Sequence, residues 1–98
     1  MTLDTITLDD FLPVVSSVFQ IKANNVELNL ELIEAKASKV QPPNHARQGF
    51  SLLFRGPQSP QLLQQIVPLE HKTLGLLEIF LVPVGADERG TQYEAVFN

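Results

Sequence analysis

The sequence predicts a mainly β fold, a small antiparallel barrel or half-open barrel of five to six strands with one short N-terminal helix. Three observations favour this fold. An almost continuous apolar run, LGLLEIFLVPV, occupies residues 74–84. A strict alternation of apolar and polar residues begins at Val26, and shorter apolar segments follow between prolines and glycines. Closure into a barrel is economical for so few strands because it removes exposed strand edges.

The N-terminal segment predicts a short helix over about residues 8–15. Thr7 and Asp10 have the spacing of a capping box, with Asp in place of the usual Glu. Ile6 and Phe11 have the spacing of a hydrophobic staple, in which one residue before the helix packs on one inside it. The side chains expected on the buried side of this helix are Phe11, Leu12 and Val15.

The segment from Val26 to Val40 predicts a bent strand. Apolar and polar residues alternate up to Leu32, and the phase then slips at Ile33. A β-bulge produces such a slip and bends the strand, as the corner of a barrel requires. A long helix is the alternative, because Glu, Leu, Ala and Lys all favour helices. Four successive alternations favour the strand.

Further strands are expected at residues 18–22, 50–55 and 66–72, before the apolar run. Matching apolar residues across the hairpin sets Leu69 opposite Ile79 and His71 opposite Leu77, with Gly75 in the left-handed position of a three-residue loop. This register leaves one unfavourable like-charge pair, between glutamates 70 and 78. The same argument sets Tyr93, Ala95 and Phe97 opposite Leu81, Ile79 and Leu77 on the same inner face.

Residues 74–84 predict a central strand buried on both faces, because a half-exposed strand would alternate with polar residues. Leu77, Ile79 and Leu81 are expected to face the barrel interior. The outer side chains then need a cover, which is either the N-terminal helix or a second protein subunit. The predicted interface residues on this outer face are Leu76, Phe80, Val82 and Val96.

The composition limits the function classes. The length of 98 residues predicts a single domain over residues 1–98, and the absence of cysteine excludes disulfides and thiolate metal sites. A net charge of −4 disfavours nucleic acid as a partner. No signal-peptide pattern and no apolar run long enough to span a membrane are present. We therefore expect a cytoplasmic protein with no membrane partner.

Candidate chemistry is sparse. His45 lies in a proline-rich loop, where a solvated histidine is the ordinary interpretation. His71 is expected to turn inward as a hydrogen-bonded structural residue, because its neighbours Glu70 and Lys72 point to the opposite face and no carboxylate orients it as a base. No metal-ligand spacing, phosphate loop or nucleophile motif is present. The sequence thus predicts no catalytic residues, no metal and no cofactor.

Arg55 ends an apolar strand beside Gly56 and Pro57. It is expected either to pair with a carboxylate such as Glu94 or Glu31, or to recognise an anion. Arg55 and His71 are therefore the candidate contacts for a small ligand or anion at the barrel mouth. This ligand-binding domain is the alternative function. The leading prediction is a non-enzymatic structural or interaction module that contacts a protein partner, or a second copy of itself, through the outer apolar face.

Three stretches carry a family resemblance: TLDDFLPVVSSVFQI at 7–21, FSLLFRGP at 50–57, and LEHKTLGLLEIFLVPVG at 69–85 followed by YEAVFN at 93–98. They cover most of the chain, which resembles an uncharacterised family of small bacterial domains of unknown function. Members of that family are often encoded near phage-tail-like or tail-collar proteins. The resemblance implies a structural accessory of such an assembly, without an assigned activity.

Overall fold

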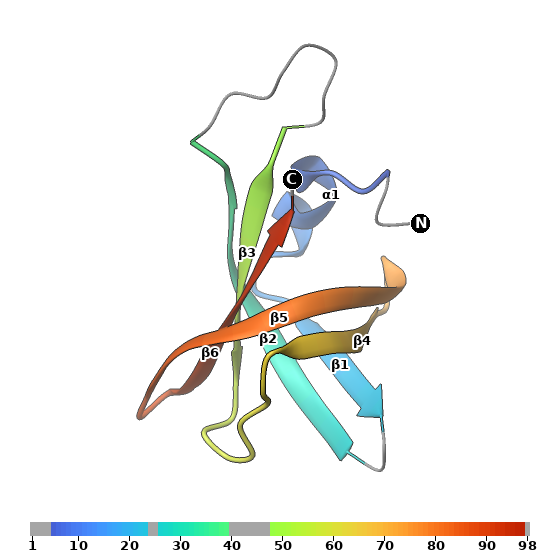
Figure 1. The fold of residues 1–98 in the computed structure, drawn as a ribbon. Helices are drawn as coiled ribbons and strands as arrows, with labels where there is room; N and C mark the ends of the chain where they lie inside the picture. The colour runs from blue at the N-terminus through green and yellow to red at the C-terminus, as the bar shows by residue number, and fades with distance from the viewer. Residues whose placement is uncertain (1–4, 24–25, 40–47, 98) are drawn as a thin grey trace.

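The computed structural model describes residues 5–23, 26–39 and 48–97, and the strands in this part of the chain close into a six-stranded antiparallel barrel (Figure 1). The order around the barrel is β1-β2-β3-β6-β5-β4. The barrel and its short helix confirm the predicted fold class. The elements in chain order are α1 Leu8–Phe11, the 3-10 helix η1 Leu12–Val14, β1 Val18–Ala23, β2 Val26–Ala37, β3 Phe50–Gly56, β4 Gln65–His71, β5 Gly75–Asp87 and β6 Gly90–Phe97.

The chain reaches this order through a Greek-key arrangement. β4, β5 and β6 follow one another as hairpins, whereas β3 lies beside β6 instead of β4. Residues 57–64 connect β3 to β4 at the end of the barrel away from α1 (Figure 1). The backbone N–H of Leu62 donates a 2.8 Å hydrogen bond to the hydroxyl of the buried Tyr93, which ties this connection to the barrel wall.

β2 contains the predicted bulge. Its register with β3 changes between Leu32, which lies opposite Phe54, and Glu34, which lies opposite Leu53. Ile33 is therefore the additional residue, at the position where the alternation changes phase. The prediction of a bent strand is confirmed, and the alternative of a long helix is wrong.

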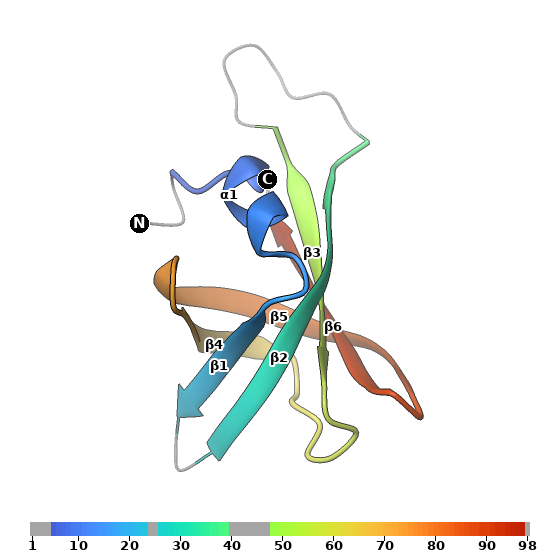
Figure 2. The ribbon, with the colours of Figure 1, turned by 180° about the vertical axis from the view of Figure 1, so that it is seen from behind.

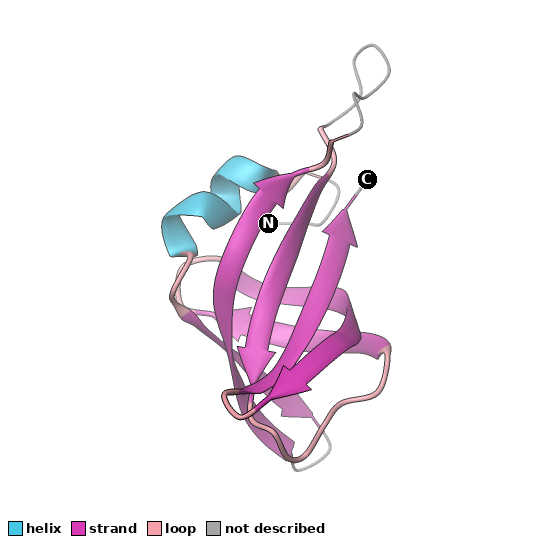
Figure 3. Cartoon of the chain, turned by 90° about the vertical axis from the view of Figure 1, so that its left-hand side faces the viewer, coloured by secondary structure: helices cyan, strands magenta, loops and turns pink. Residues whose placement is uncertain are grey.

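β5 joins the two halves of the barrel. Its first part, up to Leu81, pairs with β4, and its second part, from Val82, pairs with β6. β5 and β6 diverge beyond the pair of Val82 and Glu94, and α1 lies at this end of the barrel, where it contacts β2 (Figures 1 and 2). Figure 3 shows the helical segment beside this end of the barrel.

The predicted β4–β5 register is wrong by two residues. Leu69 lies opposite Leu77, and His71 lies opposite Gly75. A shift of two leaves every side chain on its predicted face, and it sets Glu78 opposite Pro68, so the like-charge pair is avoided. Gly75 has the predicted left-handed backbone, with φ +80°.

The predicted β5–β6 register is also wrong. Tyr93 lies opposite Pro83, not Leu81, and the register changes between Pro83 and Gly85. The predicted partners of Ala95 and Phe97 on β5 are absent, because the two strands have separated before these residues.

The helical segment is shorter than predicted but begins as expected. The N–H of Thr7 donates to Oδ2 of Asp10 at 2.8 Å, as in a capping box. Phe11 is fully buried, with its ring centroid 5.8 Å from that of Phe50 and 6.0 Å from that of Phe97. These three rings fill the end of the barrel under α1. The prediction for Leu12 is wrong: it is 48% exposed, because the chain tightens into a 3-10 turn there.

Candidate functional site

The two faces of β5 differ sharply in exposure. Leu77, Ile79 and Leu81 are buried in the barrel, as predicted. On the outer face, Leu76 is 61% exposed and Phe80 is 48% exposed. The expectation of a strand buried on both faces is therefore wrong for the chain by itself. Of the two alternative covers, the N-terminal helix is wrong, since α1 places Phe11 against rings inside the barrel and leaves the outer face of β5 exposed.

These outward side chains form what we call the outer patch, in which apolar residues and glutamates are interspersed. Ile66 on β4, missed in the sequence because a single exposed isoleucine is unremarkable, lies directly opposite Phe80. Three glutamates occupy neighbouring outward positions. Glu70 lies opposite Leu76, Glu78 opposite Pro68, and Glu94 opposite Val82. No lysine or arginine occurs in β4, β5 or β6. The outer patch consists of Ile66, Leu76, Phe80, Val82 and Val96.

His71 lies inside the barrel beneath the helical segment. It is 3% exposed, and its ring centroid is 4.5 Å from that of Phe19. Its Nδ1 accepts hydrogen bonds from the backbone N–H groups of Thr73 at 3.0 Å and Leu74 at 3.3 Å. Its Nε2 lies 2.9 Å from the hydroxyl of Ser17. The turn between β4 and β5 is thus closed over this side chain.

These partners fix the tautomer of His71. Because Nδ1 accepts two N–H groups, the ring proton is on Nε2, which therefore donates to Ser17. The Ser17 hydroxyl in turn donates to the carbonyl oxygen of Val14. A histidine that donates to a serine cannot accept its proton, so Ser17 and His71 are not a nucleophile and its base. Burial, and then the charge of Lys72, lower the pKa of His71, which keeps the ring neutral.

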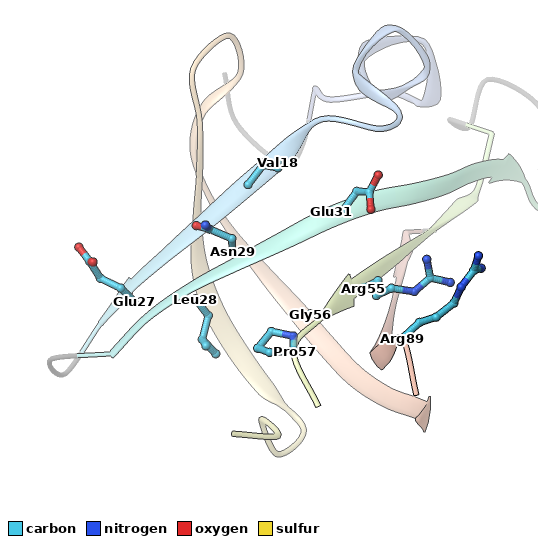
Figure 4. Close-up of a pocket in the computed structure, with 9 residues that line it drawn as sticks. All are labelled: Val18, Glu27, Leu28, Asn29, Glu31, Arg55, Gly56, Pro57 and Arg89. Carbon is cyan, nitrogen blue, oxygen red and sulfur yellow. The ribbon is translucent and has the colours of Figure 1, made fainter. Parts of the chain in front are cut away.

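Arg55 lies on the outer side of β3, at the end opposite the helical segment. Its cross-strand neighbours are Glu31 on β2 and Gln92 on β6. An open groove with a volume of about 500 Å³ runs beside it, between β2 and the turn that joins β5 to β6 (Figure 4). The residues that line this groove are Val18, Glu27, Leu28, Asn29, Glu31, Arg55, Gly56, Pro57 and Arg89.

The structure does not bring the predicted ligand contacts together. His71 is enclosed in the barrel core, whereas Arg55 lines an outer groove that does not include it. Arg89, which the sequence shows only as one charge at a loop tip, lines the groove with Arg55 instead. His45 lies outside the described residues. Among those residues, no group of three or more His, Asp or Glu side chains could hold a metal ion.

Comparison with known protein families identifies one that matches the chain. A family model with the description "Domain of unknown function (DUF6916)" matches residues 6–97. The chain belongs to this family. Searches of the curated proteins and of the solved structures found no match. The resemblance to an uncharacterised domain family is thus confirmed. Within the described part of this DUF6916 domain, no helix has the length and apolarity needed to cross a membrane.

Proposed function

We propose that this DUF6916 domain is a non-enzymatic interaction module that binds a partner protein through the outer patch. The observation that carries the proposal is the pair of Ile66 and Phe80, which face each other across two strands while 65% and 48% exposed. Leu76, beyond Glu78 on β5, is 61% exposed, and Val96, on the part of β6 that has separated from β5, is 63% exposed. Adjacent exposed apolar side chains on a sheet face are typical of protein-binding surfaces, because removing them from water is favourable.

The glutamates select the kind of partner. Glu70, Glu78 and Glu94 lie among the apolar side chains of the outer patch, and the three strands contain no lysine or arginine. A second copy docked on the same patch would bring glutamates against glutamates, and the whole chain carries a net charge of −4. A partner surface that carries both apolar and basic side chains complements both features. We therefore favour a different protein over a homo-oligomer.

The interior of the barrel supports a binding role over an enzymatic one. His71 is neutral, donates its only ring proton to Ser17, and accepts two backbone N–H groups. It has no free atom with which to act on a substrate. A role as an accessory in a phage-tail-like or other multi-protein assembly is compatible with a small module of this kind, and it is the biological setting that we propose.

A comparison of Phe80→Glu with Leu12→Glu tests the proposal. Both residues are 48% exposed, but Leu12 lies in η1 and not in the outer patch. Each variant and the wild-type domain would be immobilised and exposed to a lysate of the organism that encodes the chain. Captured proteins would then be identified and assayed individually for affinity, for salt dependence, and for protection of Phe80 against hydroxyl radicals.

We expect one protein that binds wild type and Leu12→Glu, is lost with Phe80→Glu, weakens as salt rises, and protects Phe80. Binding that survives Phe80→Glu would overturn the assignment of the outer patch. Light scattering gives a second decisive result. A dimer of the purified wild-type domain that Phe80→Glu converts to a monomer would show that the partner is another copy of the chain.

A further inference from the structure

The groove beside Arg55 is shallow and open to solvent, with a volume of about 500 Å³. None of its lining residues belongs to the outer patch, so a ligand here would be independent of the proposed protein partner.

Arg55 has an unsatisfied hydrogen-bond donor. Its Nε is buried and has no hydrogen-bond partner among the described residues. Glu31 is its cross-strand neighbour, yet the two side chains form no ion pair. The ion pair that the described residues do contain joins Lys36 to Glu34, elsewhere on β2. Buried N–H groups in folded proteins nearly always have an acceptor, and beside an open groove that acceptor is a water molecule or a bound ligand.

The fold places the guanidinium group of Arg89 beside that of Arg55. A Cβ built on Gly90 would lie 2.0 Å from the carbonyl oxygen of Gly56 and 3.5 Å from Cγ of Arg55, so β6 starts in close contact with Arg55. Arg89 directly precedes Gly90. Its N–H donates to Oδ1 of Asp87 at 2.8 Å, which fixes the turn. Two arginines presented from constrained backbone are suited to a carboxylate or phosphate group.

The lining of the groove carries both signs of charge. Glu27 and Glu31 come from β2, and Glu31 is the cross-strand neighbour of Arg55, whereas Arg55 and Arg89 come from β3 and from the β5–β6 turn (Figure 4). A simple anion would be attracted by the arginines and repelled by the glutamates. A molecule with an oxyanion at one end and an ammonium group at the other matches both.

We propose that this groove binds a small zwitterion, with its oxyanion held by Arg55 and Arg89 and its ammonium group held by the β2 carboxylates. The oxyanion is a carboxylate, as in a short peptide with free termini, or a phosphate, as in an aminoalkyl phosphate. The recognition chemistry is the same for both, and the probes below distinguish them.

Calorimetry and amide chemical-shift mapping of the whole chain provide the test. The probes are dipeptides and tripeptides with free termini, the same peptides acetylated or amidated, and phosphoethanolamine. We expect free-terminus peptides or phosphoethanolamine to bind at millimolar concentrations or below and to shift amides around Arg55 and Asn29. Blocking either charged end should weaken binding about tenfold or more. The tighter of the two probe classes identifies the oxyanion.

Matched variants localise the site. Arg55→Gln and Glu27→Gln should each weaken binding about tenfold or more, whereas Lys36→Gln, which removes a β2 charge outside the groove, should leave it unchanged. Arg89→Gln is the second cationic variant, because Arg89 is exposed and its removal does not threaten folding. Failure of every zwitterion to bind at millimolar concentrations, or equal binding of blocked and free peptides, would overturn the proposal.

Discussion

The two ends of the barrel differ in whether their buried polar groups have hydrogen-bond partners. At the end under α1, both ring nitrogens of His71 have partners, and three phenylalanine rings fill the remaining space. At the other end, Arg55 Nε and Thr91 Oγ1 are buried without partners in the described part of the chain. Polar groups that are satisfied internally stabilise a fold, whereas unsatisfied ones leave donors and acceptors for water or a ligand. The comparison is consistent with stability at the first end and with the proposed ligand site at the second.

Phe11→Ala should produce the largest effect, because it removes the ring that closes the helix end. Phe11 is fully buried against Phe50 and Phe97, and truncations of this kind cost about 3–5 kcal/mol of unfolding free energy. Chemical denaturation measures the loss. Leu12→Ala is the control, and it should change stability by no more than about 0.5 kcal/mol, because Leu12 is 48% exposed. Equal losses in the two variants would contradict the assignment of the aromatic cluster as the closure of this end.

Gly90→Ala tests the backbone of the groove end and should have the next largest effect. Gly90 has φ +133°, and an added Cβ would lie 2.0 Å from the carbonyl oxygen of Gly56. The left-handed backbone alone costs a side chain about 1–2 kcal/mol, and the displaced strand adds to this. Gly85→Ala is the matched control on β5, where a Cβ meets nothing within 4 Å. Comparable denaturation midpoints for the two variants would show that the close approach of β6 to β3 is not required.

The strands and their inward faces were predictable because alternation is a local property of the sequence. The slip at Ile33 is visible in the chain, and β2 is bulged there. Register was not predictable in the same way, because a shift of two residues preserves the apolar faces. In β4–β5 the deciding factor is the turn, whose N–H groups bind Nδ1 of His71. The apolar–polar alternation of the sequence gives no sign of that contact between His71 and the turn.

The cover of β5 and the composition of the groove could not be predicted, because both depend on the path of the chain in space. The sequence shows apolar residues on both sides of β5 but not that Phe11 turns into the barrel end. Arg55 was a candidate because it ends an apolar strand. Arg89 became one only when the close approach of Gly90 to Gly56 placed its turn beside Arg55. Ser17 belongs to no motif, and only its contact with Nε2 of His71 identifies its role.

The smallest predicted effect is a change in how stability responds to pH at the helix end. Burial, followed by the charge of Lys72, lowers the pKa of His71 in the folded state, whereas the unfolded chain keeps a value near 6.5. The unfolded state therefore takes up a proton first, so stability should be full above about pH 6.5 and should fall as the pH drops below it. His71→Asn retains an acceptor near the Nδ1 position but does not titrate. It should lower the melting temperature at pH 7.5 and flatten the decline between pH 7.5 and 5.5. His45→Asn, which removes the other histidine of the chain, should keep the wild-type slope. A wild-type slope in His71→Asn would mean that some other group senses this pH range, and that the contacts of His71 do not hold it in its neutral form.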